Sequence, residues 1–264
     1  MSLIFGIHSV LECLKQNPGL IERLYVARGA SSRPLQQIID LARKAGLPPK
    51  FESRTVLDHK SNKASHQGVV AVCTDRQYVS FDELLENLSS QTILVILDGI
   101  EDPRNLGAIL RTCAAFSVTG IILPKDHAVG ISPVVSKTAE GALEYLGIAR
   151  VTNLTRSIQT LKEKGVWVVG IESDQDKLCH EFDYCGPSAL VFGNEGTGLR
   201  RLVRENCDVL LSIPATGAIR SLNVSVAVGI ALYECTRRRL IGQNDKKSEG
   251  PTAGSFDGRR EMKL

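Results

Sequence analysis

The chain has 264 residues, and three short segments place polar side chains where a helix begins or a glycine-rich turn bends. The first runs from Asp98 to Cys113, follows an apolar strand and opens a helix that we expect Asn105 to cap. Its apolar positions predict a buried stripe, which leaves Arg104 and Arg111 together on the opposite face. Two guanidinium groups beside a helix N-terminus suit a phosphate, although two solvated surface arginines are the simpler alternative.

The second segment, Leu190 to Arg201, runs from a strand through a turn with three glycines into a helix. Glycines allow the backbone to come close to a ligand, and a plain strand-to-helix turn is the alternative. The glycine spacing differs from that of a dinucleotide fingerprint, and the carboxylate of Glu195 stands inside the turn. Because this carboxylate would repel a pyrophosphate, the segment argues against a nicotinamide or flavin site.

The third segment, Leu211 to Ala227, ends a strand at Pro214, continues through small residues and opens a long apolar helix. We expect Ser221 to cap this helix, with Asn223 and Ser225 in its first turn. Polar groups gathered at a helix start, after a loop that can fold back, are typical of one wall of a ligand pocket. Simple helix capping would also explain Ser221 by itself.

Together the three segments resemble the motifs of the SpoU/TrmH class of knotted (SPOUT) methyltransferases in order, spacing and residue identity. The chain has Asn-x5-Arg from Asn105, Phe-Gly-Asn-Glu-Gly-x-Gly from Phe192, and Ile-Pro followed by Ser-Leu-Asn-Val-Ser from Ile213. Residues 6–10 and 66–69 further resemble the substrate-binding domain of 23S rRNA guanosine-2′-O-methyltransferases of the RlmB type. The resemblance covers about residues 3–240.

This resemblance implies an enzyme that moves a methyl group from S-adenosylmethionine to a ribose 2′-hydroxyl of RNA, with a guanosine of 23S rRNA as the expected target. It implies these donor-contacting residues: Gly193, Ile213 and Leu222, with Gly170 and Glu172 as further candidates. It gives the catalytic role to Arg111 and implies that the ribose and Arg111 are positioned by Asn105, Glu195, Ser221 and Asn223.

Two roles for Arg111 remain open at the level of sequence. A guanidinium hardly ever loses its proton in a protein, so Arg111 could clamp a neighbouring phosphate while a phosphate oxygen or a water takes the hydroxyl proton. Alternatively, Arg111 could itself be the base. The resemblance also implies a deep trefoil knot at the C-terminal end of the catalytic domain, a homodimer, and an N-terminal RNA-binding domain similar to ribosomal protein L30-like folds.

The elements that must position these residues alternate along the chain. Residues 1–74 predict a small α/β unit with helices over 9–15 and 35–45 and strands over 21–27 and 69–73. We expect a linker over 75–91 with a helix over 81–88, the methyltransferase domain over 92–242 and a disordered tail over 243–264. After residue 92 we expect strands at 93–97, 120–123, 148–151, 166–171, 189–192 and 209–213. The helices expected between them cover 106–116, 133–145, 155–164, 199–206 and 222–239. Such alternation predicts a mostly parallel sheet with helices on both faces.

Charge and composition fit an RNA partner. Residues 1–74 carry ten Lys or Arg against five Asp or Glu, whereas the rest carries 22 against 24. A basic N-terminal region followed by a near-neutral remainder suggests an anionic partner that binds mainly to residues 1–74. Ordinary scatter of charges along the chain is the alternative. The seven cysteines have no C-x-x-C pair, so we expect reduced thiols and no metal. No apolar run could span a bilayer, and we expect a cytoplasmic protein.

Three other functions compete with this interpretation. The same chemistry on tRNA is the nearest, and the additional basic N-terminal domain argues for rRNA instead. A catalytically silent RNA-binding protein is the second, and it predicts that the methyl donor does not bind. A nicotinamide oxidoreductase is the third, and the absence of a glycine fingerprint after the strand that ends at Asp98 argues against it.

Overall fold

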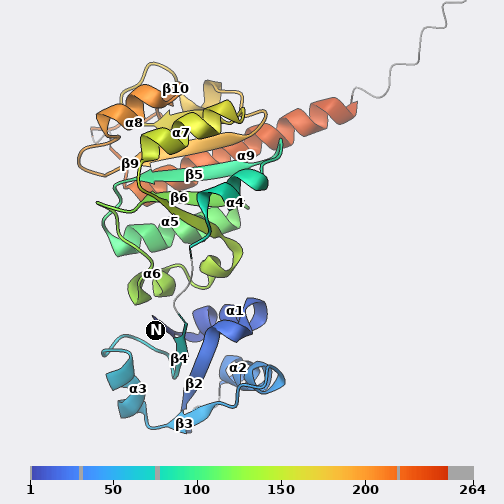
Figure 1. The fold of residues 1–264 in the computed structure, drawn as a ribbon, viewed down its shortest axis with the longest axis vertical. Helices are drawn as coiled ribbons and strands as arrows, with labels where there is room; N and C mark the ends of the chain where they lie inside the picture. Colours follow the sequence, from blue (N-terminus) through green and yellow to red (C-terminus); the bar gives the residue numbers. More distant parts are fainter. Residues whose placement is uncertain (1, 30–31, 75–77, 219–220, 249–264) are drawn as a thin grey trace, which may run out of the picture.

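Apolar strand runs and the helices between them build two separate sheets along the chain (Figure 1). The computed structural model describes residues 2–29, 32–74, 78–218 and 221–248. The first sheet belongs to the N-terminal residues and has four strands, and the second has six strands and follows Thr92. Residues 75–77 of the predicted linker and residues 249–264 of the predicted tail lie outside the described residues.

The N-terminal sheet has the strand order β1-β4-β2-β3, and only the β2–β3 pair is parallel. Its elements are β1 (Ser2–Phe5), α1 (Ile7–Gln16), η1 (Pro18–Leu20), β2 (Ile21–Ala27), α2 (Arg33–Lys44), β3 (Lys50–Glu52), α3 (Arg54–Lys60) and β4 (Val69–Cys73). Apolar side chains of α1 and α2 pack on one face of this sheet, and Leu57 of α3 packs on the other. The predicted strands at 21–27 and 69–73 are confirmed, whereas β1, β3 and α3 were not predicted.

The second sheet is parallel throughout, in the order β10-β8-β9-β5-β6-β7. Its strands are β5 (Ile93–Asp98), β6 (Gly120–Pro124), β7 (Gly147–Val151), β8 (Trp167–Ile171), β9 (Ser188–Gly193) and β10 (Val209–Leu211). All six predicted strands of this region are therefore present, with ends shifted by one or two residues. Since parallel strands bring their carboxyl ends to one edge, the loops after β5, β8, β9 and β10 share that edge.

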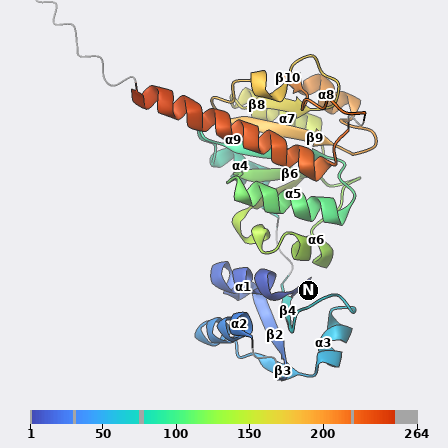
Figure 2. The same ribbon diagram turned by 180° about the vertical axis from the view of Figure 1, so that it is seen from behind.

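Helices cover both faces of this parallel sheet (Figures 1 and 2). One core cluster joins the sheet to α5 (Pro103–Ala115), α6 (Pro133–Thr138), η2 (Ala142–Tyr145) and α9 (Val224–Ser248). The other joins it to α4 (Phe81–Glu86), α7 (Leu154–Glu163) and α8 (Arg201–Asn206), while η3 (Cys179–Glu181) lies in the β8–β9 connection. The far end of α9 projects beyond the sheet in both views.

Several predicted helix boundaries are wrong. The helix expected over 133–145 is interrupted after Thr138, because Glu140 and Gly141 both have positive φ angles and cannot continue an α-helix. The helix expected from residue 222 begins at Val224 and continues to Ser248, so residues 243–248 are helical where a disordered tail was predicted. Among the described residues, no helix is long and apolar enough to cross a membrane.

Candidate active site

The first predicted segment forms α5 and its entry turn at the carboxyl end of β5. Asp102, and not Asn105, caps this helix: its side chain accepts a hydrogen bond from the backbone N–H of Arg104 at 2.7 Å. The predicted buried stripe is confirmed, because Leu106, Ile109, Leu110 and Cys113 are all buried. Asn105 lies one turn further in, so its amide is available for a contact with another segment.

The second segment forms the turn between β9 and α8. Only a glycine fits at its first position, Gly193. A Cβ added at Gly193 would lie 2.1 Å from the backbone carbon of Gly198, closer than any side chain can come. Asn194 holds the turn: its Nδ2 donates to the carbonyl of Gly99 at 2.9 Å, and its Oδ1 accepts from the N–H of Gly196 at 2.9 Å. The turn is therefore tied to the loop that follows β5.

A buried carboxylate that the sequence did not single out anchors the same turn. Asp98, at the end of β5, has a fully buried side chain that accepts from the backbone N–H and the guanidinium of Arg200. A buried charge of this kind is stabilised only when it is paired and hydrogen-bonded. The sequence could have indicated this role of Asp98. An aspartate at the end of a fully apolar strand is rarely buried unless another group pairs with it.

Glu195 connects the three motif segments. Its Oε1 accepts a hydrogen bond from Nδ2 of Asn105 at 2.7 Å, from Nδ2 of Asn223 at 2.6 Å, and from the backbone N–H of Val224 at 3.3 Å. The Nδ2 of Asn223 also lies 3.1 Å from Oδ1 of Asn105. Two asparagines more than a hundred residues apart are thus joined through one carboxylate, which we call the Asn105–Glu195–Asn223 cluster.

Asn223 also starts the last helix, where the sequence predicted Ser221. Its Oδ1 accepts from the backbone N–H of Ser225 at 3.0 Å and from the Ser225 hydroxyl at 2.6 Å. Ser221 lies before the helix and lines a pocket, so its predicted role as the helix cap is wrong. Residues 219 and 220 of the third segment lie outside the described part of the chain.

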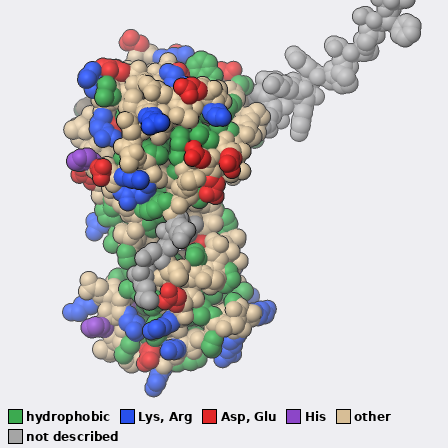
Figure 3. All heavy atoms as spheres, in the orientation of Figure 1, with side chains coloured by type: hydrophobic (Ala, Val, Ile, Leu, Met, Phe, Trp, Pro, Cys, Tyr) green, Lys and Arg blue, Asp and Glu red, His purple; other side chains and the backbone are tan. Residues whose placement is uncertain are grey.

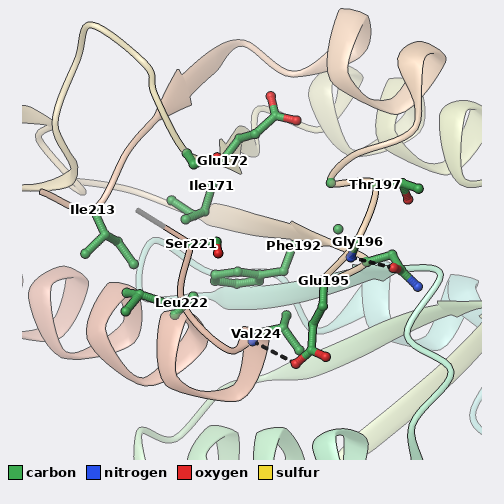
Figure 4. A pocket seen from close by; sticks show the side chains of 15 residues that line it. Ile171, Glu172, Phe192, Glu195, Gly196, Thr197, Ile213, Ser221, Leu222 and Val224 are labelled. Atoms are coloured by element: carbon green, nitrogen blue, oxygen red, sulfur yellow. Dashed lines mark hydrogen bonds between the residues drawn. The ribbon is translucent and has the colours of Figure 1, made fainter. Parts of the chain in front are cut away.

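A pocket of about 410 Å³ lies beside this cluster (Figure 4). In the close view, Ile213 and Leu222 lie next to each other on one side, the ring of Phe192 lies beneath, and Glu195 lies on the other side. Its lining comes from the ends of β8 and β9, the 194–198 turn, the segment between β10 and α9, and the start of α9: Ile171, Glu172, Ser173, Phe192, Gly193, Asn194, Glu195, Gly196, Thr197, Gly198, Ile213, Ser221, Leu222, Val224 and Ala227.

Most of the residues proposed from the sequence meet at this pocket. Of the five donor-contacting candidates, four line it: Gly193, Ile213, Leu222 and Glu172. The fifth, Gly170, lies within β8 and is not among the lining residues. A Cβ at Gly170 would come within 2.6 Å of the side chain of Leu210 and 3.1 Å of that of Cys207. Packing under β10 therefore explains why glycine stands at this position.

Arg111 stands apart from the cluster in this structure. Its Nη1 forms an ion pair with Oε1 of Glu140 at 2.9 Å, on the side of α5 that faces α6. Arg104 and Arg111 are both exposed, as the helical spacing predicted. Two residues further along α5, burial raises the pKa of the Cys113 thiol well above its usual range, so this thiol stays protonated and packs as an apolar group.

Among the described residues, no group of three or more His, Cys, Asp or Glu side chains is arranged to hold a metal ion. The lining of the pocket includes the carboxylates of Glu172 and Glu195, of which Glu172 pairs with Nε of Arg204 at 3.1 Å, and no Lys, Arg or His stands among the lining residues that the structure describes. Such a pocket at the carboxyl edge of a parallel sheet suits an uncharged or cationic ligand better than a pyrophosphate.

A parallel α/β domain with a strand-end pocket, preceded by a small basic α/β domain, is the arrangement expected of an RNA-modifying methyltransferase of the SpoU type. The chain belongs to the SpoU rRNA Methylase family, whose sequence model matches residues 92–233. Residues 3–79 match a second family model, described as RNA 2′-O ribose methyltransferase substrate binding. The resemblance noted in the sequence is therefore confirmed.

Individual relatives agree with this family. The 23S rRNA (guanosine-2′-O-)-methyltransferase RlmB of Coxiella burnetii is 46% identical over 239 residues, covering 89% of this chain and 95% of that protein. RlmB of Escherichia coli is 41% identical over 240 residues, covering 90% and 98%. The crystal structure of the SpoU methyltransferase AviRb from Streptomyces viridochromogenes, in complex with the cofactor AdoMet, has a TM-score of 0.78 at 25% identity and covers 91% of each chain.

Proposed function

We propose that this protein transfers a methyl group from S-adenosylmethionine to the ribose 2′-hydroxyl of a guanosine in 23S rRNA. The observation that carries the proposal is the Asn105–Glu195–Asn223 cluster, which brings all three motif segments to the rim of one pocket. Relatives of that activity align over about nine-tenths of the chain, which supports the same reaction and substrate.

The residues of the pocket fit the methyl donor. When bound, S-adenosylmethionine supplies a methyl group that its positive sulfonium makes electrophilic. The carboxylate of Glu195, with no basic side chain among the described lining residues, is compatible with that charge, and the glycine at 193 lets the 194–198 turn close against the end of β9. We propose that Gly193, Ile213, Leu222 and Glu172 hold the donor.

The residues around the pocket would then prepare the ribose. A 2′-hydroxyl is a poor nucleophile until its proton leaves, and its oxygen must be held in line with the bond that breaks. We propose that Asn105, Asn223 and Ser221 contact the ribose, and that Glu195 fixes the two amide groups through its hydrogen bonds.

Of the two roles left open for Arg111, we propose the phosphate clamp. A guanidinium in a protein binds phosphate through its N–H groups and has no lone pair with which to accept a proton. A phosphate oxygen of the RNA or a water molecule would then take the proton of the 2′-hydroxyl.

A methyl-transfer assay with labelled donor and 23S rRNA tests the proposal. We expect Arg111→Ala to lower the rate by a factor on the order of 100 or more, as loss of a charge-stabilising group commonly does. Arg201→Ala is the matched control, because Arg201 is also an exposed arginine in an ion pair, with Glu205 at 2.9 Å. Methyl transfer by Arg111→Ala at the wild-type rate would refute the role of Arg111.

The same assay separates the competing functions. Methylation of tRNA in preference to 23S rRNA would support the tRNA alternative. A silent RNA-binding protein would show no transfer and no binding of S-adenosylhomocysteine in calorimetry. Mapping 2′-O-methylation on rRNA from cells with and without this protein would identify the modified nucleotide.

We further propose the domain division 1–74, 75–91 and 92–242, with an L30-like RNA-binding N-terminal domain and a deep trefoil knot in the catalytic domain. Membership of the family supports the knot. The excess of Lys and Arg over residues 1–74, several of which appear on the surface of the N-terminal domain in Figure 3, supports RNA binding there. We place the enzyme in the cytoplasm, with its RNA substrate.

We also propose that the protein is a homodimer. Five large apolar side chains of α9 are exposed at helical spacing on one side: Val226, Ile230, Tyr233, Leu240 and Ile241. Such a stripe on a surface helix marks a contact with another polypeptide. Light scattering should give twice the chain mass for the wild type, and Tyr233→Glu should shift it toward the monomer. A monomeric wild type would refute the proposal.

A further inference from the structure

The partner of Arg111 belongs to a segment that also carries the N-terminal domain. Glu140 lies between α6 and η2, has a positive φ of 47°, and its backbone N–H donates to the carbonyl of Lys137 at 3.2 Å. Its neighbours Ala139 and Ala142 are buried in the catalytic core. A left-handed backbone conformation is unfavourable for glutamate, so packing on both sides must hold this residue in place.

The same segment is in direct contact with α1 of the N-terminal domain. In Figures 1 and 2, α6 and the segment after it lie between α5 and α1. A Cβ added at Gly141 would lie 2.6 Å from Cβ of Glu12, so the two backbones approach too closely for any side chain. Gly141 directly follows Glu140, and its φ of 89° also favours glycine.

Hydrogen bonds hold this domain contact from both sides. The hydroxyl of Tyr145 donates to Oε2 of Glu12 at 2.5 Å and accepts from Nε2 of Gln16 at 3.1 Å. Nδ2 of Asn17 donates to Oε2 of Glu144 at 2.6 Å. The hydrogen bond from Lys15, together with that from Tyr145, holds the pKa of Glu12 below its usual range, which keeps this carboxylate an acceptor.

We propose that Glu140 is a positioning residue for Arg111, and that it links this arginine to the N-terminal domain through residues 141–145. The inference rests on the proposed function, in which Arg111 clamps an RNA phosphate. Glu140 binds Nη1, which leaves the other N–H groups of the guanidinium for that phosphate. The N-terminal domain would thus have two roles: it binds the RNA, and through residues 141–145 and Glu140 it helps to orient the Arg111 side chain that contacts the RNA phosphate.

The ion pair is too exposed to matter much for stability, since 59% of the Arg111 side chain and 44% of the Glu140 side chain are accessible. Its effect is on orientation: a free arginine must lose its rotamer freedom when it binds the phosphate, whereas a paired one has already lost part of it. Glu140→Gln should therefore lower kcat more than it lowers the stability of the protein or the affinity for either substrate.

The test measures methyl transfer to 23S rRNA at saturating donor, together with S-adenosylhomocysteine binding. We expect Glu140→Gln to lower kcat by about tenfold, the order of loss for a misdirected catalytic group, with KM for RNA and the affinity for S-adenosylhomocysteine within about twofold of wild type. Glu205→Gln is the matched control, because Glu205 also pairs with an exposed arginine at 2.9 Å. It should leave all three quantities unchanged.

Tyr145→Phe tests the link to the N-terminal domain, since it removes only the hydroxyl that binds Glu12 and Gln16. We expect Tyr145→Phe to lower kcat about threefold. A double variant with Glu140→Gln should be no slower than Glu140→Gln alone, because both changes act on Arg111 through the same chain of contacts. Losses that multiply in the double variant would overturn the link.

The outcomes separate this inference from the function on which it rests. A wild-type protein that transfers no methyl group refutes the proposed function. An active wild type that loses activity with Arg111→Ala, but keeps full kcat with Glu140→Gln, refutes the positioning role alone. If Glu140→Gln does not fold, Glu140→Asp replaces it with the same expectation, because its shorter side chain withdraws the carboxylate from Arg111.

Discussion

Removing the carboxylate of Glu195 should break the hydrogen bonds that join the three motif segments, while the donor site keeps its shape. In Glu195→Ala, the side-chain amides of Asn105 and Asn223 and the backbone N–H of Val224 lose a shared acceptor. Asn105 and Asn223 then keep the contact with each other, and Asn223 keeps the hydrogen bonds from Ser225, but both amides lose the carboxylate that fixes their orientation beside the ribose. The donor site on the other side of the pocket, at Ile213 and Leu222, keeps its shape (Figure 4).

The size of the effect follows from these three hydrogen bonds. Glu195 is exposed, so water replaces part of each bond, and the low end of the usual range applies, about 0.5–1 kcal/mol per bond. Three bonds give roughly 1.5–3 kcal/mol, which corresponds to a rate lower by about 10–100-fold if the positioning acts in the transition state. Glu195→Gln keeps an acceptor oxygen and loses only the charge, so its loss should be smaller, about 3–10-fold.

Single-turnover methyl transfer with labelled donor and 23S rRNA is the assay, with S-adenosylhomocysteine calorimetry on the same samples. Glu163→Ala provides the control, because Glu163 is an exposed carboxylate at the end of α7, on the other face of the sheet from α5 and α9. A Glu195→Ala variant within twofold of wild type would show that the cluster does not position the substrate. An equal loss of rate and donor affinity would place Glu195 in donor binding instead.

Three further predictions concern the donor turn and the core. Gly193→Ala should abolish S-adenosylhomocysteine binding in calorimetry, because its Cβ would lie 2.1 Å from the backbone of Gly198. Glu234→Gln should destabilise the protein in urea at about pH 7. Because two arginines of α9 hold the pKa of Glu234 below its ordinary 4.5, this difference should be complete above pH 4.5 and should shrink as the pH falls below it. Tyr184→Phe should lower the free energy of unfolding by about 1–2 kcal/mol in urea titrations, since its buried hydroxyl donates to a backbone carbonyl at 2.9 Å.

The parallel sheet and the meeting of the motifs could be predicted from the sequence. Strands buried on both faces are continuous apolar runs, so β5 and β9 were recognisable without any pairing information. Once the sheet is parallel, the residues that follow its strands must share one edge, which is how Asn105 and Glu195 come together across 90 residues. Their spacing within the motifs then identifies the family.

Helix starts and short strands were not predictable in the same way. Asp102 and Asn105 can both cap a helix, and the choice depends on Glu195, a distant residue that occupies the Asn105 amide. Strand β3 has only three residues, none of them buried, so it leaves no apolar alternation to detect. The ion pair between Arg111 and Glu140 depends on how α6 packs on α5, which no local pattern in the sequence describes.

Glu195 shows why one carboxylate can argue against one class of ligand and for another. Inside a glycine turn at a strand end, its charge opposes a pyrophosphate, which usually binds at such turns. The same charge is compatible with a sulfonium, and its lone pairs hold the two asparagines whose amides face the pocket rim. A glutamine there would relieve the repulsion of phosphate but weaken both hydrogen bonds, since bonds to a charged acceptor are the stronger ones. Position 195 therefore favours glutamate under two conditions: the ligand beside it is not a phosphate, and Asn105 and Asn223 must be held in place. Methyl transfer from a sulfonium donor to a ribose meets both conditions.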